Sequence, residues 1–136
     1  PMGVPGGVGY YNGGAVVTNS TSVITAADGN PNAVYFGFDS SEIDAQGQAV
    51  LNQQAQFLQA NPSARVAIAG HTDERGSREY NLALGERRAQ AAQAYLATSG
   101  VSASRMEAIS YGEDQPADPG HDEAAWAKNR RAEISY

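Results

Sequence analysis

The residues best suited to chemistry lie in two short segments, 70–76 and 86–88. The first reads Gly-His-Thr-Asp-Glu-Arg-Gly and follows alternating apolar residues, which places Asp73 at the end of a predicted strand. A carboxylate followed by Gly76 and a new helix combines a cation-binding group with the free N–H donors of a helix N-terminus, which suit an anion. Further along this helix, Arg88 could hold a carboxylate through two hydrogen bonds. These features outline a receptor for a zwitterion.

The same residues also have a purely structural interpretation. Asp73 could cap the helix or its own loop, while Arg87 and Arg88 could be solvated or pair with Glu86. Spacing along the chain alone does not show that Asp73 and Arg88 lie close together in space. Residue types alone therefore leave both interpretations open and favour the structural one.

Metal and catalytic sites have little support in the sequence. His71 and His121 are far apart and have no cluster of other ligand-type residues, so we expect hydrogen-bonded loop histidines rather than a metal site. Asp73 and Glu74 do not suit the carboxylate pair of a glycosidase, because neighbours on an extended segment point to opposite sides. We therefore expect neither a metal site nor a glycosidase, and no cofactor.

The composition is that of one globular domain that does not bind nucleic acid. The chain has 136 residues, of which 41% are hydrophobic and 18% charged, and its net charge is -6. Binding to nucleic acid relies on basic residues that neutralise phosphates, and this chain has no run of them. The absence of cysteine excludes disulfides and thiolate metal sites. No apolar stretch approaches the roughly 20 residues of a membrane-spanning helix.

Two regions of different composition follow each other along the chain. Residues 1–32 are rich in Gly, Asn, Ser and Thr and carry one charge, Asp28, which predicts a flexible tether. A short strand around Ala15–Thr18 or Val23–Ala26 is the alternative. Regular hydrophobic periodicity begins at Ala33, so residues 33–136 are the predicted folded domain.

The periodicities of residues 33–136 alternate between strand and helix. Strands are predicted at 34–38, 65–70, 106–111 and 132–136. Helices are predicted from a cap at Ser40 or Asp44 to Asn61-Pro62, over 79–99 before Gly100, and over 123–130 after Asp122. The order β-α-β-α-β-α-β predicts an α/β (α+β) sandwich with helices packed on a mixed sheet of undetermined strand order. Trp126 is expected in the core.

Several segments together resemble the OmpA-like domain family, and within it the peptidoglycan-associated lipoproteins of the Tol-Pal system. They read Val-Tyr-Phe-Gly-Phe-Asp at 34–39, Gly-His-Thr-Asp-Glu-Arg-Gly at 70–76, Glu-Tyr-Asn at 79–81, Leu-Gly-Glu-Arg-Arg-Ala at 84–89, Ser-Tyr-Gly at 110–112, Gly-His-Asp-Glu-Ala-Ala at 120–125 and Lys-Asn-Arg-Arg-Ala at 128–132. They follow the order of the family and extend over the whole predicted domain. The resemblance implies an OmpA-like fold for residues 33–136.

The resemblance also implies a non-catalytic domain that binds the diaminopimelate of the peptidoglycan stem peptide. In the family, the aspartate matching Asp73 contacts the ammonium group, and the arginine matching Arg88 contacts the carboxylate. Arg88 rather than Arg87 is the match, because it directly precedes the alanine of the motif. Such a pair would distinguish diaminopimelate from lysine, which lacks the second carboxylate. Further contacts are expected at Phe38, Asp39, Thr72, Asn81 and Leu84.

Partners and location are likewise implied by the resemblance. The expected location is the periplasmic face of the outer membrane of a Gram-negative cell, and the expected role is in the cell envelope and in cell division. The β-propeller protein of the Tol system is expected as a second partner. The lipoproteins of this group are anchored to the outer membrane through an acylated N-terminal cysteine, and the given sequence contains no cysteine.

Two other classes of function stay open. An enzyme acting on the cell wall would need a positioned acid, base or metal, which the sequence does not reveal. A protein-interaction module with a degenerate ligand site is the other possibility, and the intact Asp73 and Arg88 argue against it.

Overall fold

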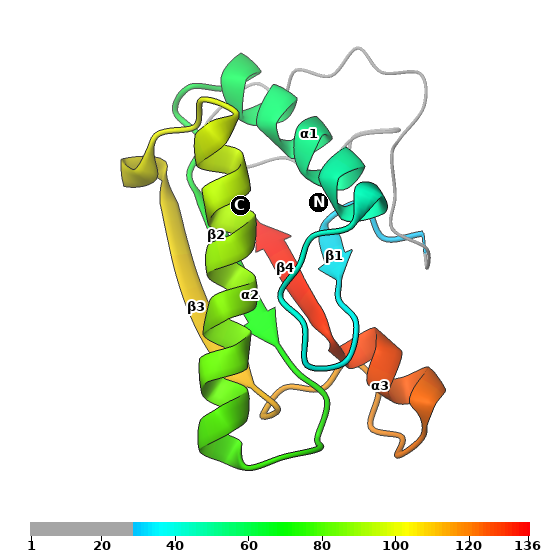
Figure 1. Ribbon diagram of the computed structural model, residues 1–136. Helices are drawn as coiled ribbons and strands as arrows, with labels where there is room; N and C mark the ends of the chain where they lie inside the picture. Colours follow the sequence, from blue (N-terminus) through cyan, green and yellow to red (C-terminus); the bar gives the residue numbers. More distant parts are fainter. Residues whose placement is uncertain (1–28) are drawn as a thin grey trace.

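A computed structural model describes residues 29–136 of the chain (Figure 1). From the N-terminus its elements are β1 (Ala33–Tyr35), α1 (Ala45–Ala60), β2 (Val66–His71), α2 (Arg78–Thr98), the short 3-10 helix η1 (Ala103–Arg105), β3 (Met106–Gly112), α3 (Glu123–Asn129) and β4 (Arg131–Ser135). The predicted tether, residues 1–32, lies outside the described residues except for 29–32. The predicted order of strands and helices is confirmed, and η1 is an addition to it.

The helices begin at side chains that accept hydrogen bonds from the first turn. Asp44 rather than Ser40 caps α1, through a 2.8 Å bond from the Gly47 N–H. Ser77 caps α2 and Asp122 caps α3 in the same way. Each cap satisfies an N–H group that has no partner within its helix.

The first strand is shorter than predicted, because the chain leaves the sheet after Phe36. The Phe36 N–H still donates to the Arg130 carbonyl at 2.9 Å, but Asp39 has a φ of 54° in the left-handed region. A strand cannot continue through that conformation. Residues 36–44 instead form a loop that crosses toward α2.

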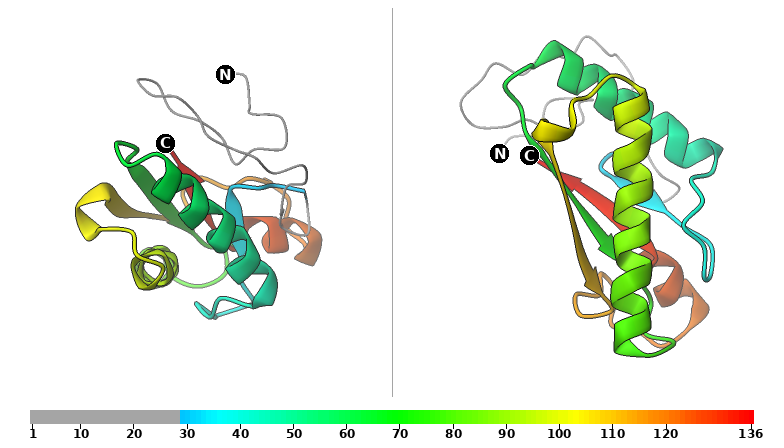
Figure 2. Two further views of the ribbon diagram at one scale, coloured as in Figure 1. Left: turned by 90° about the horizontal axis from the view of Figure 1, so that it is seen from above. Right: turned by 60° about the vertical axis from the view of Figure 1, so that its left-hand side comes forward.

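The four strands form one mixed sheet in the order β1-β4-β2-β3. β2 and β3 are parallel, whereas β4 is antiparallel to both β1 and β2. The helices α1 and α2 pack on the same face of this sheet, as the view from above in Figure 2 shows. The core between them contains Val50, Leu51 and Leu58 of α1, Ile68 of β2 and Leu96 of α2. The predicted layered fold with a mixed sheet is thereby confirmed.

Two glycines bring α2 unusually close to the sheet. A Cβ atom on Gly70 of β2 would lie 1.7 Å from the Gly85 carbonyl oxygen, and one on Gly85 would lie 2.4 Å from the Ser110 hydroxyl oxygen. The backbones of β2 and α2 therefore touch at this point. The close approach holds Arg88, less than one turn beyond Gly85, over the end of β2.

His71 ends β2 as a buried histidine, not as the hydrogen-bonded loop residue that was predicted. The residue is 2% exposed, and its ring stacks on Tyr111 of β3 with centroids 5.5 Å apart. Within the described part of the chain neither of its ring nitrogens has a hydrogen-bond partner. Burial, with help from the nearby Arg131 charge and against that of Glu133, lowers the pKa of His71 to about 4. The histidine prediction is therefore wrong for His71, because β2 extends one residue further than expected.

We predict that Gly70→Ala destabilises the fold by about 3 kcal/mol, because its methyl group would overlap a backbone carbonyl that cannot move without shifting α2. Urea denaturation would measure the loss. Gly37→Ala is a matched control, since its Cβ would meet only the Ser40 Cβ at 3.9 Å. Equal stability of the two variants would contradict the close approach.

We also predict that His71 makes the fold sensitive to acid. A histidine that is buried in its neutral form stabilises the fold fully above its unfolded pKa of about 6.5, and this contribution is lost as the pH falls toward the folded pKa of about 4. The loss is on the order of 3 kcal/mol. Urea denaturation at pH values across this window should show a smaller loss for His71→Phe, which keeps a ring against Tyr111. An equal loss in both proteins would show that His71 does not carry the effect.

Candidate ligand-binding site

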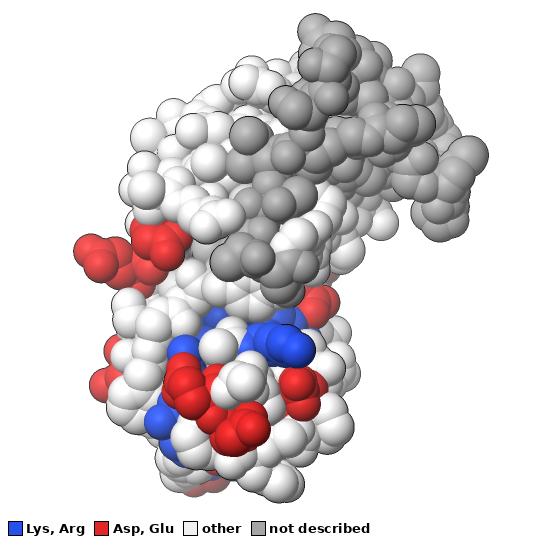
Figure 3. Space-filling model, turned by 90° about the vertical axis from the view of Figure 1, so that its right-hand side faces the viewer, with Lys and Arg blue, Asp and Glu red and all other residues white. Residues whose placement is uncertain are grey.

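All the predicted contact residues line one cavity of about 200 Å³. The cavity lies between the β1–α1 loop, the β2–α2 loop and the first turns of α2. Its lining is Phe38, Asp39, Thr72, Asp73, Arg75, Gly76, Tyr80, Asn81, Leu84 and Arg88. Figure 3 shows that charged side chains of both signs gather at the α3 end of the molecule on the face it draws. The fold thus brings together residues that are far apart in the sequence.

Asp73 is a buried carboxylate held by its own loop. Its Oδ1 accepts the Arg75 main-chain N–H at 2.9 Å and Nε at 3.2 Å, and its Oδ2 accepts the Arg75 Nη2 at 2.7 Å. The Nη1 of Arg130 lies 3.5 Å from Oδ2. Burial alone would raise the pKa of Asp73, but the bonds from Arg75 and Arg130 outweigh it and lower that pKa. Asp73 is therefore ionised at neutral pH.

Part of the structural interpretation of Asp73 holds. Its carboxylate does cap its own loop, through the bond to the Arg75 N–H. It does not cap α2, since Ser77 occupies that position.

Arg88 is the largest fully buried side chain among the described residues. Its guanidinium donates from Nε to the Ser40 carbonyl at 2.8 Å, from Nη1 to the His71 carbonyl at 2.9 Å and from Nη2 to the Gly37 carbonyl at 3.1 Å. Burial lowers the pKa of Arg88 to about 10, against the opposing effect of the Asp73 charge. Arg88 is cationic at neutral pH, and the alternative of a solvated side chain paired with Glu86 is wrong.

Thr72, Asn81 and Leu84 line the cavity with little exposed surface. The Asn81 amide nitrogen donates to the Asp73 carbonyl at 3.3 Å, to the Arg75 carbonyl at 3.1 Å and to the Glu113 carboxylate at 2.7 Å. The Thr72 N–H donates to the Gly112 carbonyl at 2.9 Å. These bonds fix the β2–α2 loop against α2 and the end of β3, so Asn81 has a structural role beside any ligand contact.

Phe38 and Asp39 form the outer rim of the cavity. Phe38 is 63% exposed, an unusual position for a large apolar side chain. The Asp39 carboxylate accepts a hydrogen bond from the Tyr80 hydroxyl of α2, which links the β1–α1 loop to the helix across the cavity.

Sequence reasoning missed Arg75 and Tyr80 of the lining and misplaced Trp126. Trp126 is half-buried and lies outside the core, where its Nε1 donates to the Glu74 carboxylate at 2.9 Å and its ring packs on Arg75. The spacing of apolar residues in α3 could not reveal a contact with a loop so far away in the sequence. His121 is hydrogen-bonded as predicted, since its Nδ1 lies 2.8 Å from both carboxylate oxygens of Glu74.

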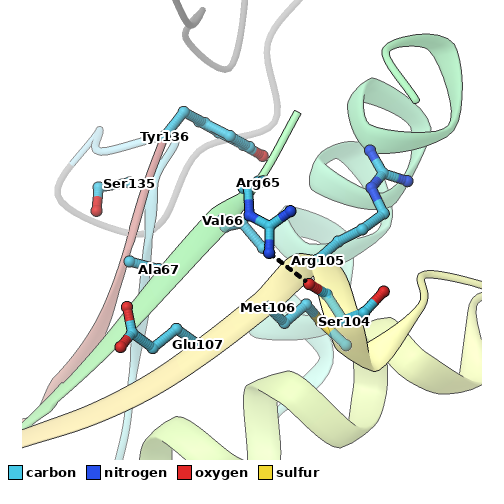
Figure 4. A pocket seen from close by; sticks show the side chains of 9 residues that line it. All are labelled: Arg65, Val66, Ala67, Ser104, Arg105, Met106, Glu107, Ser135 and Tyr136. Atoms are coloured by element: carbon cyan, nitrogen blue, oxygen red, sulfur yellow. Dashed lines mark hydrogen bonds between the residues drawn. The ribbon is translucent and has the colours of Figure 1, made fainter. Parts of the chain in front are cut away.

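A larger cavity of about 450 Å³ lies elsewhere, at the other end of the sheet (Figure 4). Arg65 donates there to the Ser104 carbonyl at 3.0 Å, whereas Arg105 points into the end of α1 and donates to the Leu58, Asn61 and Ala64 carbonyls. None of the predicted contact residues lines it. We take the smaller cavity as the candidate site, because it combines buried, ionised groups of opposite charge.

Neither a metal cluster nor a spanning helix is found in the described residues. Residues 29–136 contain no group of three or more His, Cys, Asp or Glu side chains that could hold a metal ion. Within the same residues, no helix combines the length and the apolar character needed to cross a bilayer.

Two relatives found by comparison with known proteins share one name. The peptidoglycan-associated lipoprotein of Haemophilus influenzae is 52% identical over 105 residues, which cover 77% of this chain and 69% of that protein. The protein of the same name from Pseudomonas aeruginosa is 50% identical over 100 residues, covering 74% of this chain and 59% of that protein. This chain therefore spans only part of the length of its relatives.

Solved structures agree with the sequence comparison. The crystal structure of the peptidoglycan-associated lipoprotein from Burkholderia pseudomallei has a TM-score of 0.76 at 48% identity and covers 81% of this chain and 96% of that one. The C-terminal domain of Helicobacter pylori MotB, at 23% identity, shares the fold with a TM-score of 0.69 and covers 75% of this chain and 80% of that one. The sequence profile of the OmpA family matches residues 35–130. Because this match takes in all the lining of the candidate site, and relatives are half identical, we conclude that the chain belongs to the OmpA family.

Proposed function

We propose that this chain binds peptidoglycan non-covalently, through the diaminopimelate of the stem peptide, and catalyses no reaction. The observation that carries this proposal is that an ionised, buried Asp73 and a cationic, buried Arg88 line the same cavity. The name shared by the relatives, peptidoglycan-associated lipoprotein, supports the choice of ligand.

The chemistry of diaminopimelate matches this pair of charges. Its side chain ends in an ammonium group and a carboxylate on the same carbon, so a receptor needs an anion and a cation on the two sides of one small cavity. The Asp73 carboxylate favours the charged form of Arg88, because it raises the pKa of Arg88 against the effect of burial. In our proposal Asp73 receives the ammonium group and Arg88 the carboxylate.

Arg88 retains donors for this task although its side chain is buried. A guanidinium has five N–H donors, and three of them donate to carbonyls in the described chain. In our proposal the other two, on Nη1 and Nη2, receive the planar carboxylate of the ligand. Fixed donors lose little entropy when a ligand arrives, which favours affinity.

The other lining residues complete the proposed site. Phe38 and Leu84 offer apolar contacts to the methylene chain of the ligand, whereas Asp39, Thr72 and Asn81 offer polar ones. This mixture of apolar walls and a few fixed polar groups is typical of sites that bind small ligands.

In the cell we propose a link between the outer membrane and the wall. The chain would work on the periplasmic face of the outer membrane of a Gram-negative cell, tied to the membrane by a lipid anchor outside these residues. Its second partner would be the β-propeller protein of the Tol system. The proposal rests here on the family and on the names of the relatives.

We predict that calorimetric titration shows tighter binding of a meso-diaminopimelate stem peptide than of its lysine counterpart, by roughly 10-fold to 100-fold. The lysine peptide would leave the buried Arg88 without the carboxylate that it binds, which costs about 1 to 3 kcal/mol. Asp73→Asn should lose binding to both peptides, because it removes the partner of the ammonium group.

Arg88→Lys should lose the preference for diaminopimelate, since a lysine ammonium cannot hold a carboxylate and three carbonyls in the geometry of a guanidinium. Arg78→Gln is the matched control, because Arg78 lies on the same helix and pairs with Asp114 outside the cavity, and it should bind as the unaltered chain does. Circular dichroism would check that each variant folds. A folded, unaltered chain that binds neither peptide, or binds both equally, would refute the proposal, and turnover of the peptide would favour an enzyme.

A further inference from the structure

We propose that Arg75 is a positioning residue for Asp73, and that Phe38 and Trp126 hold its guanidinium in place. The inference rests on the proposed function, which gives Asp73 the ammonium group of the ligand. It extends the site to α3, no residue of which lines the cavity.

Arg75 fixes the Asp73 carboxylate through both oxygens. The main-chain N–H and Nε of Arg75 donate to Oδ1, and its Nη2 donates to Oδ2. A carboxylate offers about four acceptor positions, and Arg75 occupies three of them. The contact of Arg130 with Oδ2 is 3.5 Å long, at the outer limit for a hydrogen bond. Oδ2 therefore keeps acceptor capacity for a further donor.

Two aromatic rings from distant parts of the chain contact the Arg75 guanidinium. Its central carbon lies 4.2 Å from the centroid of the Phe38 ring and 4.1 Å from that of the Trp126 ring. Both distances are well within the range of a cation–π contact. Both rings therefore pack against the guanidinium, which is also hydrogen-bonded to Asp73.

A second set of contacts holds Trp126 in turn. Its Nε1 donates to Glu74, whose carboxylate also contacts the Nδ1 of His121. The β2–α2 loop, α3 and the loop before α3 are thus joined around Arg75. This network explains why Trp126 lies outside the core, in contact with Arg75 and Glu74.

Arg75 could instead be a competitor that occupies Asp73 until the ligand displaces it. The contacts with two rings and the two side-chain bonds to Asp73 favour a fixed support over a mobile gate. Without the guanidinium, Asp73 would keep its buried position but lose two of its three bonds to Arg75. The two roles predict opposite changes in affinity when Arg75 is replaced.

Removal of the guanidinium should also change the protonation of Asp73. The charges around this carboxyl group are the cations Arg75, Arg88 and Arg130 and the carboxylates Glu74 and Glu123. Burial raises the pKa of Asp73, and the bonds from Arg75 are the strongest effects that lower it. Without them the carboxyl group takes up its proton at a higher pH, and a protonated Asp73 binds an ammonium group poorly.

The test is calorimetric titration of the folded chain with a meso-diaminopimelate stem peptide from about pH 4 to about pH 8. We expect Arg75→Gln to bind roughly tenfold more weakly or worse at neutral pH. Its binding should disappear at a higher pH than that of the unaltered chain as the solution is acidified. The preference for diaminopimelate over lysine should persist, because Arg88 is intact.

Three further variants separate positioning from a general structural role. Arg75→Lys, which keeps the charge, should recover part of the affinity and of the pH profile. Trp126→Leu should change the affinity and the pH profile in the same direction as Arg75→Gln. If Arg75→Gln does not fold, Trp126→Leu tests whether Arg75 positions Asp73. Arg78→Gln is the matched control, because Arg78 pairs with Asp114 at 2.7 Å outside the cavity. It should leave both quantities unchanged.

Tighter binding by Arg75→Gln would identify Arg75 as a competitor and overturn the inference. Unchanged affinity with an unchanged pH profile would overturn it as well. In either case the proposed function survives if the unaltered chain binds the peptide and Asp73→Asn does not. Absence of binding by the unaltered chain would instead refute the proposed function and the inference together.

Discussion

The buried charge of Arg88 constrains two of the segments around the candidate site. A guanidinium is costly to hold away from water unless its nitrogens have hydrogen-bond partners, and each nitrogen of Arg88 donates to a carbonyl of the β1–α1 loop or of the last residue of β2. The same bonds hold the loop that carries Phe38 and Asp39 at the rim of the cavity. The guanidinium that is proposed to bind the ligand therefore also holds the loop that forms the rim of the cavity.

This arrangement depends in turn on how closely α2 approaches the sheet. Gly70 and Gly85 let the backbones of β2 and α2 touch, so a helix residue can reach the carbonyl of His71. The capped start of α2 at Ser77 and the bonds of Asn81 then fix the loop that carries Asp73. Small residues and hydrogen-bonded loops thus hold two opposite charges in one cavity, with little freedom to move apart.

The sequence predicts the elements better than it predicts contacts between them. Periodicity and capping residues identify the strands and helices to within a few residues, since these signals are local. The prediction of which residues line the cavity rested on a resemblance to a family, because spacing alone could not predict that Asp73 and Arg88 lie close together. The stacking of Trp126 on Arg75 and the burial of His71 escaped prediction for the same reason: both depend on where α3 and β3 lie in space.

The most direct test of the central claim is a crystal structure of the chain with a bound meso-diaminopimelate stem peptide. Our account predicts that the ammonium nitrogen lies within hydrogen-bond distance of the Asp73 Oδ2, and that the neighbouring carboxylate meets Nη1 and Nη2 of Arg88. A ligand bound in the larger cavity beside Arg65, or one whose charged end contacts neither Asp73 nor Arg88, would contradict it.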